Sequence, residues 1–366
     1  MDNKKKFWCA FSKLTKTSSA FVNKLYSHFG DIEYAWNADL EELKQVSGIL
    51  KNSVNAFIEE RKKITPEECI DYLEEKNIDF IYPDDVRYPY LLRNIDNPPT
   101  GLLMLGDLNN CNLERTLAVV GSRKASDNSK LTLSKILAGF HDTDICIISG
   151  LAEGIDTVAH KAAVENNIRT IAVLGGGFER LYPASNKKLF EKILEENGVI
   201  ISEYWPDSEP ISWHFPQRNR IVSGLSKGVL IAEAALKSGA MITANLALEQ
   251  GKELMCMPGL ISNPNTQGIY KLIKDGATII TTPEDILDAM NWTIEKTSEI
   301  TKNSNIDNLN DKEKKIVELI KKDALSIDEL IIKTNLNIND LMVILTKLEL
   351  DGFVTRTNTE KYISLK

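Results

Sequence analysis

A chain of 366 residues with 43% apolar and 26% charged side chains has the composition of an ordinary globular protein of two or three domains, which excludes extensive disorder. Its apolar runs fall far short of the roughly 20 residues that cross a bilayer, and its lysine-rich start lacks an apolar signal segment. A net charge of −8 argues against broad binding to duplex DNA, although a local pocket can still hold a short strand. We therefore expect a cytoplasmic protein without membrane contact.

The cysteines point to the same compartment. Five of them are scattered without a CxxC pair, and an odd number suits a reducing environment better than a disulfide framework. We expect reduced, mostly buried thiols at Cys9, Cys69, Cys111, Cys146 and Cys256.

Residues 1–80 are predicted to form a small helical domain of the SAM or helix-hairpin-helix type, because apolar residues recur at three- and four-residue spacing. Residues 43–49 resemble half of a helix-hairpin-helix, in which Gly48 would let a helix N-terminus approach a phosphate. Leu50 lies near the place of the second glycine of that motif. We therefore favour plain helix packing over DNA contact in this segment.

Residues 81–116 are predicted to be an extended connector, because four prolines between positions 83 and 99 stand among aromatic and charged residues. From residue 117 to about 290, short apolar runs alternate with amphipathic helical patterns, which indicates an α/β fold with a Rossmann-like parallel sheet covered on both faces. The expected strands are, in order, LAVVGSR, ICIISGLA, RTIAVLGGG, GVIISEY, GVLIAEAA, ELMCMPG and ATIIT. In such sheets ligands bind at the carboxyl ends of the strands.

Residues 291–310 are polar and rich in threonine and asparagine, so they are predicted to be a linker. Residues 311–366 follow the order of a winged helix, with three short helices and then a hairpin. Their ten basic and ten acidic side chains cancel, and the third helix carries Asp340, Glu349 and Asp351 against Lys347 alone. Because this helix is poorly equipped for a major groove, we favour a protein-contact module.

The ends of the first two expected strands carry groups that can bind an anion. The first end has Gly121, Ser122 and Arg123, and a helix starts just after it. The second end has Ser149, Gly150 and Gly154, where glycines let the backbone approach an anion at a helix N-terminus. A routine tight turn explains Gly-Ser-Arg alone, but two such loops side by side favour a binding site.

The third strand ends in three consecutive glycines, Gly175, Gly176 and Gly177. Glycines lose much conformational entropy on folding, so such a run is unfavourable unless a ligand or another backbone passes close by. None of these loops matches GxGxxG with an acidic partner, and no GxxxxGK[ST] is present. Neither NAD nor ATP is therefore indicated, and we expect no cofactor. The glycines suggest phosphates of another kind.

Residues 213–220, WHFPQRNR, group three aromatic rings with two arginines. Rings that stack bases beside guanidinium groups that hold phosphates are what a single-strand platform requires. A hydrophobic staple with arginines that pair with acidic neighbours explains the segment equally well. Further on, Lys237, Ser238 and Gly239 open another helix after Glu233, which gives a further anion-binding helix start.

Taken together, these motifs are similar in order and spacing to those of the DprA/Smf family. The resemblance covers about residues 117–280 and is carried by GSR, SGLAEGID, TIAVLGGG, LYPASN, ISEY, FPQRNRIVSGLS, EAALKSGAMITANLALEQG and MPG. It implies a non-catalytic core that binds single-stranded DNA, forms a homodimer, recruits RecA recombinase and protects incoming DNA during natural transformation. The sequence departs from the family pattern at Tyr270, where asparagine is common, which leaves the role of that loop open.

The expected single-strand site combines the motif residues. Its members are Gly121, Ser122, Arg123, Ser149, Gly150, Gly154, Gly175, Gly176, Phe215, Arg218, Asn219, Arg220, Lys237, Ser238 and Gly239.

An enzymatic alternative remains. Rossmann cores of this kind also resemble lysine-decarboxylase-like enzymes that cleave nucleoside monophosphates with a Glu and an Arg at the carboxyl edge, roles open to Glu233 and Arg220. The PGGxGTxxE signature of that group is absent. Asp156 and His160 lie four residues apart on one helix face without a third ligand, so a hydrogen-bonded structural pair is favoured over a metal site.

Overall fold

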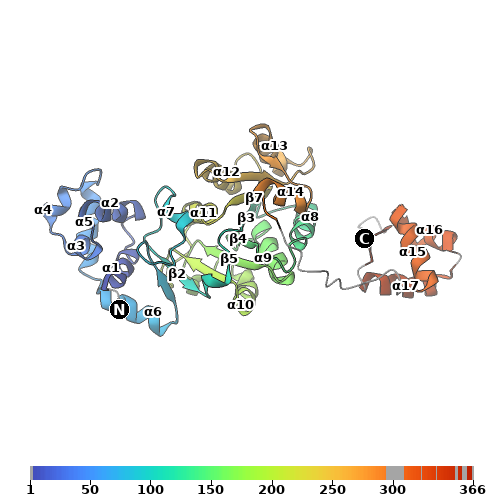
Figure 1. Cartoon of the computed structure of the whole chain (residues 1–366), viewed down its shortest axis with the longest axis horizontal. Coiled ribbons are helices and arrows are strands. Elements are labelled where there is room, and N and C mark those ends of the chain that lie inside the picture. Colours follow the sequence, from blue (N-terminus) through green and yellow to red (C-terminus); the bar gives the residue numbers. More distant parts are fainter. Residues whose placement is uncertain are drawn as a thin grey trace. The chain divides into compact units, whose positions relative to one another are not determined.

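The computed structural model describes residues 3–293, 309–322, 324–334, 336–350, 353–356 and 361–364. The chain divides into two compact units, residues 1–294 and 295–366 (Figure 1). The linker predicted at residues 291–310 lies largely outside the described residues.

The N-terminal part of the first unit is helical, as the apolar spacing predicts. Side chains cap several of its helices: Ser18 accepts a hydrogen bond from the amide of Phe21, and Asp39 forms a capping box with Glu42. Leu43, from the segment that resembles a helix-hairpin-helix, is fully buried in this helical core. The helices are α1 (Asn3–Ser12), α2 (Ser19–Phe29), α3 (Ile32–Asn37), α4 (Leu40–Lys44), α5 (Lys51–Arg61) and α6 (Pro66–Glu75).

A nine-stranded sheet follows, in the order β1-β2-β6-β5-β4-β3-β7-β8-β9. Each of the seven strands expected from the apolar runs is present. They are β3 (Thr116–Gly121), β4 (Cys146–Ser149), β5 (Arg169–Leu174), β6 (Val199–Ser202), β7 (Gly228–Glu233), β8 (Glu253–Cys256) and β9 (Thr278–Ile279). These seven strands pair in parallel with one another, as near-continuous apolar runs require.

The stretch predicted as a connector differs from the expectation. It contributes β2 (Leu102–Leu105), which pairs antiparallel with β6 and with β1 (Asp79–Ile81), and also α7 (Tyr90–Arg93). The prolines interrupt only positions 83–99, whereas the four residues of β2 are apolar and largely buried between β1 and β6. Packing on the sheet, and not the proline content, therefore determines the structure of residues 102–105.

Helices cover both faces of the sheet (Figure 1). On one face α8 and α9 pack on side chains such as Leu117 and Val119, and on the other α11 and α12 pack on Ala118 and Val120. The strand order places the carboxyl ends of β3 and β7 side by side, where doubly wound sheets form their binding crevice. The helices of this part are α8 (Asp127–Ala138), α9 (Ile155–Glu165), α10 (Lys187–Glu195), α11 (His214–Gly224), α12 (Gly239–Glu249), α13 (Gln267–Lys274) and α14 (Pro283–Met290).

The second unit has the predicted order of three helices followed by a hairpin. A short strand, β10, joins the hairpin to give a three-stranded sheet in the order β10-β12-β11. Its elements are α15 (Asp311–Lys322), β10 (Leu325–Ser326), α16 (Ile327–Thr334), α17 (Ile338–Leu350), β11 (Val354–Arg356) and β12 (Lys361–Ser364). Lys347, the lysine of the acidic third helix, donates a hydrogen bond to Glu313 at 2.8 Å.

Two further expectations concern the whole chain. All five cysteines are unpaired and buried, as predicted. Among the described residues, no helix has the length and apolar character needed to span a bilayer. The fold class is therefore α/β with a mainly parallel sheet, an N-terminal helical region and a small C-terminal unit.

Candidate nucleic-acid interface

The loop after β3 is hydrogen-bonded to the start of α9. The amide of Ser122 donates to the carbonyl of Glu233 at 2.8 Å, and the amide of Ile155 donates to the carbonyl of Ser122 at 3.2 Å. Gly154 has φ +78°, and a Cβ there would lie 2.3 Å from the oxygen of Ser122. The glycine is required by this close approach of two loops, which fixes the backbone that carries Arg123.

Glu233 fixes the other end of the same loop. Its fully buried carboxylate accepts hydrogen bonds from the amide of Ser126 at 3.2 Å and from the hydroxyls of Ser126 and Ser129 at 2.7 Å. These contacts hold the first turn of α8 against the end of β7. The hydrogen bonds of Glu233 thus position the loop, whereas the enzymatic alternative gives this residue a catalytic role.

An exposed arginine and two aromatic rings meet above this loop. The guanidinium carbon of Arg123 lies 5.1 Å from the ring centroid of Phe215, and the ring of Tyr182 lies 5.6 Å from it on a tilted plane. Phe215 rests on Gly175, where a Cβ would lie 2.8 Å from the ring. Tyr182 is 50% exposed and was not among the expected site residues, although it follows the glycine loop within the LYPASN motif.

Arg218 lies beneath this surface and is 4% exposed. Its Nη1 donates to the carbonyl of Gly150 at 2.7 Å and to that of Val173, while Nε donates to Asn219 at 3.3 Å. A Cβ on Gly150 would lie 2.4 Å from the guanidinium, so this glycine makes room for the arginine. Arg218 thus ties the ends of β4 and β5 together.

The neighbours of Arg218 are equally enclosed. Ser149 is fully buried and donates to the carbonyl of Val119 at 2.7 Å. Asp156 accepts from the amides of Gly150 and Ala152, and burial raises the pKa of this carboxyl even though the charge of Arg218 lowers it. Together these groups form a buried polar layer under the exposed rings.

Arg220 belongs to a different environment from Arg123. Its Nη2 binds both oxygens of Glu203, at 2.7 and 2.9 Å, and approaches the hydroxyl of Ser19 at 3.2 Å. Ser19 is the first residue of α2, so Arg220 joins the core to the N-terminal helices. The sequence predicted that Arg123, Arg218 and Arg220 line one pocket, whereas in the structure each of them has different contacts.

The start of α12 forms an open edge of the site. Ser238 is the N-cap residue of this helix in extended conformation, and its buried hydroxyl has no hydrogen-bond partner among the described residues. A Cβ on Gly239 would meet nothing within 4 Å, and Lys237 is exposed beside it. This helix start has an unpaired hydroxyl, and no close contact explains its glycine.

The remaining glycines of the third loop have packing reasons. A Cβ on Gly176 would lie 3.1 Å from Pro210, and one on Gly177 would lie 2.2 Å from the oxygens of Trp205 and Pro206. The glycine run thus lets residues 205–210 pass close to the end of β5. The sequence predicted that either a ligand or another backbone segment comes close here, and for these two glycines it is a backbone segment.

The pair predicted at Asp156 and His160 is not joined by a hydrogen bond. The Nδ1 of His160 lies 2.8 Å from the hydroxyl of Thr170, while Asp156 binds backbone amides. Burial, together with the charge of Arg218, lowers the pKa of His160 to about 3. Both residues are structural, but each has its own partners. The described residues contain no cluster of three or more metal-ligating side chains.

The loop around Tyr270 is stabilised from within. The hydroxyl of Tyr270 donates to the carbonyl of Gly259, and Thr266 donates to that of Leu260 at 2.7 Å. Tyr270 therefore fastens the loop between β8 and α13 onto the helix. Leu260 and Ile261 at its tip are 68% and 81% exposed.

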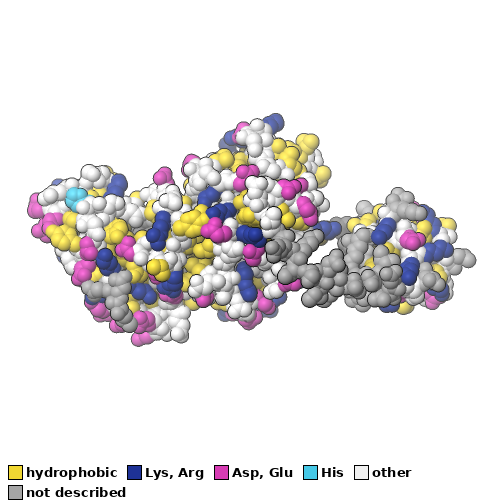
Figure 2. Space-filling model, viewed as in Figure 1, with side chains coloured by type: hydrophobic (Ala, Val, Ile, Leu, Met, Phe, Trp, Pro, Cys, Tyr) yellow, Lys and Arg dark blue, Asp and Glu magenta, His cyan; other side chains and the backbone are white. Residues whose placement is uncertain are grey.

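On the face shown in Figure 2, basic side chains are interspersed with hydrophobic and acidic ones and do not form a continuous field. This distribution agrees with the net charge of −8. Binding of a polyanion would have to depend on local geometry, such as that around Arg123.

Comparison with known proteins extends this picture. The family described as DNA recombination-mediator protein A matches residues 79–291, and the DprA winged helix domain matches residues 301–358. Protein Smf from Synechocystis is 36% identical over 284 residues, which cover 77% of this chain and 71% of that protein. The second unit is therefore a winged helix domain.

Two solved structures resemble the chain. The X-ray structure of DNA processing protein A from Streptococcus pneumoniae superposes with a TM-score of 0.67 at 32% identity, over 79% of this chain and 98% of that one. DNA processing protein A from Helicobacter pylori, described for its single-stranded DNA binding mode, gives a TM-score of 0.52 at 28% identity, over 58% and 96% of the two chains.

Proposed function

Because the chain belongs to the DNA recombination-mediator protein A family, whose members are named DprA or Smf, we propose that it binds single-stranded DNA and delivers the strand to a RecA recombinase. The observation that carries the proposal is the placement of the exposed Arg123 over the ring of Phe215, beside the half-exposed Tyr182. The related protein from Helicobacter pylori is described as binding single-stranded DNA, which supports the same ligand here.

The chemistry of this cluster suits an unpaired strand. A base can stack on the exposed parts of Tyr182 and Phe215, while the guanidinium of Arg123 neutralises the adjoining phosphate. A duplex keeps its bases stacked on each other, so it offers these rings no free face. The proposed preference is therefore for single strands over duplex.

The other expected site residues take three kinds of role in this proposal. Ser122, Asn219, Lys237, Ser238 and Gly239 are proposed to contact backbone phosphates at the carboxyl edge and at the start of α12. The buried or close-packed residues act through positioning, since they hold the loops in place. These are Gly121, Ser149, Gly150, Gly154, Gly175, Gly176 and Arg218. Arg220 is proposed to act at the junction with the N-terminal helices.

A binding titration tests the proposal. Fluorescent oligothymidylate and a hairpin duplex of equal charge are titrated with the protein and with Arg123→Gln. We expect much tighter binding of the single strand, and a loss of about 0.7 in the slope of log affinity against log salt for the variant. Arg115→Gln is a matched control, because Arg115 pairs with Asp144 next to the opposite end of β3. Equal affinity for the duplex would contradict the proposal.

We propose that the protein acts by binding and not by catalysis. Incubation with nucleoside monophosphates is expected to release no free base. Base release that disappears in Glu233→Gln would instead support the nucleotide-cleaving alternative and make strand binding secondary.

Homodimer formation, recruitment of RecA and protection of incoming DNA in natural transformation are parts of the same proposal, since the family resemblance implies them. A filament assay tests the RecA step. RecA added to strands coated with a single-strand-binding protein should assemble faster in the presence of this protein, and Arg123→Gln should remove the acceleration. Unchanged assembly with the parent protein would contradict the RecA part alone.

A further inference from the structure

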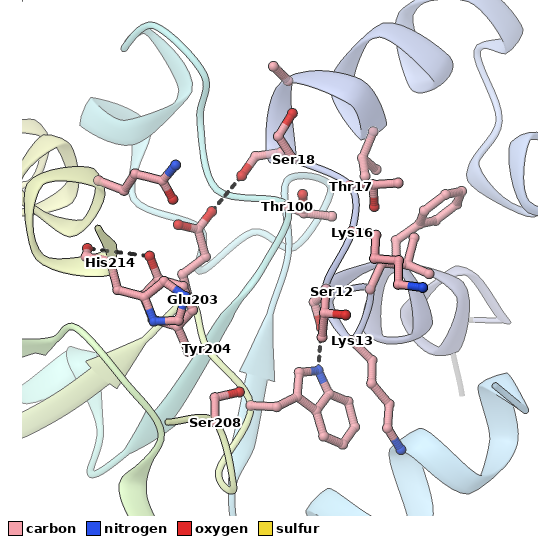
Figure 3. Close-up of a pocket in the computed structure, with 18 of the residues that line it drawn as sticks. Ser12, Lys13, Lys16, Thr17, Ser18, Thr100, Glu203, Tyr204, Ser208 and His214 are labelled. Atoms are coloured by element: carbon pink, nitrogen blue, oxygen red, sulfur yellow. Dashed lines mark hydrogen bonds between the residues drawn. The ribbon is translucent and has the colours of Figure 1, made fainter. Parts of the chain in front are cut away.

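A cavity of about 880 Å³ lies between the N-terminal helices and the core (Figure 3). One wall is the loop that joins α1 to α2, with Ser12 and Lys16 among the residues drawn there. The other wall follows β6 and continues into the first turns of α11, from Glu203 to Arg220. Both walls belong to the first unit of the chain.

Aromatic rings dominate the core side of the cavity. His214 stacks on Tyr204 with ring centroids 3.8 Å apart, and Trp213 stands edge-on to His214 at 4.3 Å. Trp213 is 51% exposed, whereas Trp205 deeper in the wall is 5% exposed. An exposed indole at the mouth of a cavity is a stacking surface for a planar group.

The acidic residues of the cavity are mostly neutralised within the protein. Glu203 binds Arg220 and Ser19, and Glu209 lies 3.5 Å from the guanidinium of Arg180. The other charged residues that line the cavity are Asp207 on the core wall and the exposed Lys13 and Lys16 on the opposite loop. The charged side chains that line the N-terminal wall are therefore both basic.

Several polar atoms of the cavity residues have unused hydrogen-bonding capacity. Thr17 Oγ1, His214 Nδ1 and Arg220 Nη1 are buried and have no hydrogen-bond partner among the described residues. Burying such groups without hydrogen-bond partners costs free energy. A polar ligand in the cavity would provide partners for some of them after small movements of the walls.

The cavity adjoins the proposed strand site. The first turn of α11 presents Phe215 to the site with Arg123, while Trp213 and Gln217 line the cavity. The segment before this turn also links the two places, since Gly177 donates to the carbonyl of Ser208 at 3.0 Å. A strand bound at Phe215 would need only to cross the start of α11 to enter the cavity.

We propose that the junction cavity is a second subsite for the same strand and binds the nucleotides that flank those at Phe215. In this subsite Trp213 stacks a base, and Lys13 and Lys16 neutralise phosphates. The inference rests on the proposed single-strand binding and adds to it a role for the N-terminal helices. It also gives Arg220 a place in binding, because this residue holds Glu203 and the start of α2 together at the cavity's floor.

Oligothymidylates of increasing length, from about 4 to about 20 nucleotides, separate the two subsites. The variants are Trp213→Leu and the double change Lys13→Gln with Lys16→Gln. We expect each to weaken binding of the longest strand about five- to tenfold and to leave the shortest strand within about twofold. The lysine variant should also lower the log–log salt slope of the long strand by about 1.4. Arg123→Gln should weaken strands of every length.

Controls keep the result interpretable. Trp213→Phe retains a ring and should bind the long strand within about twofold of the parent, which distinguishes stacking from a general disturbance of α11. Lys62→Gln with Lys63→Gln removes two exposed lysines of the same helical region that do not line the cavity, and should leave both affinities unchanged.

Three results would overturn the inference. Junction variants that bind every strand like the parent, while Arg123→Gln binds weakly, would show that the cavity is not a subsite and would leave the proposed function intact. Equal weakening for the shortest and longest strands would show that there is no separate subsite. A parent protein that binds none of the strands would reject the proposed function itself.

Discussion

Three arginines near the carboxyl edge of the sheet differ in their burial and in their contacts within the fold. Arg123 is exposed over Phe215, Arg218 is buried against two carbonyl groups, and Arg220 is held by Glu203. Burial lowers the pKa of Arg218, but a guanidinium remains charged at any physiological pH. Substitutions at these positions should therefore separate binding from stability.

Arg218→Met is expected to destabilise the fold by about 2–4 kcal/mol, because it leaves the carbonyls of Gly150 and Val173 without their donor. Arg123→Gln should change stability by less than about 0.5 kcal/mol, as expected for an exposed side chain. Thermal melting followed by circular dichroism measures both. Similar melting temperatures for the two variants would show that Arg218 does not hold the strand ends.

Phe215→Leu should weaken binding of a single strand by about 1–3 kcal/mol, since the stacking surface is lost while apolar packing on Gly175 is partly retained. Phe215→Trp keeps an aromatic face and should bind within a few-fold of the parent. Fluorescence anisotropy with labelled oligothymidylate measures the difference. If the leucine variant binds like the parent, the ring is not a stacking platform.

His160 makes stability depend on pH. Its pKa in the folded state is about 3, below the value near 6.5 of an unfolded histidine, so the unfolded state binds the extra proton between these values. Its contribution is fully present above pH 6.5 and is lost as the pH falls, by about 2 kcal/mol at pH 5. Unfolding of the parent and of His160→Gln at pH 7 and pH 5 measures this.

The variant should lose less stability than the parent on this change of pH. His28→Gln, on the exposed surface of α2, is the control and should behave like the parent. An identical pH response in the parent and in His160→Gln would show that His160 is not buried in its neutral form.

At the scale of an element, the start of α8 depends on a residue from a distant strand. Ser126 and Ser129 in this helix start both donate to Glu233 at the end of β7. The N-terminal turn of α8 and the loop with Arg123 are therefore positioned by tertiary contacts as well as by the local cap at Ser126.

Glu233→Gln should loosen this helix start, because an amide nitrogen would face donors in place of one carboxylate oxygen. Amide hydrogen exchange in residues 122–129 should become faster, and single-strand affinity should fall a few-fold through Arg123. Hydrogen exchange followed by mass spectrometry measures the first effect. The control is Lys135→Gln in the last turn of the same helix, which should leave exchange at the helix start unchanged. Unchanged exchange in the Glu233 variant would contradict the positioning role.

At the scale of the whole molecule, the two compact units are expected to work separately. Trp292 packs on the α8 and α9 face, so the first unit should be retained through Thr293. A chain ending there should keep its single-strand affinity within a few-fold, because the contacts proposed here lie in the first unit. A loss of about tenfold, or roughly 1.4 kcal/mol, would show that the winged helix domain also contacts DNA.

The same truncation bears on the proposed homodimer. Leu341 and Leu345 of α17 are buried inside the winged helix domain, while Val343 is 70% exposed on its outer side. Leu260 and Ile261 expose comparable apolar side chains in the first unit. Sedimentation of full and truncated chains compares the two surfaces: a dimer that survives truncation depends on the first unit.

The sequence alone determined the seven parallel strands, the order of the domains and the loops at the carboxyl edge, because these depend on local apolar runs, caps and glycines. It also led to Arg123 and Phe215, since both follow directly from a strand end and a helix start. Tertiary structure decided the rest. Arg218 is buried because carbonyls 68 and 45 residues earlier in the chain converge on it, a contact that no local pattern encodes. The pairing of β2 with β6 and the cavity between α2 and α11 likewise arise only when distant segments pack together.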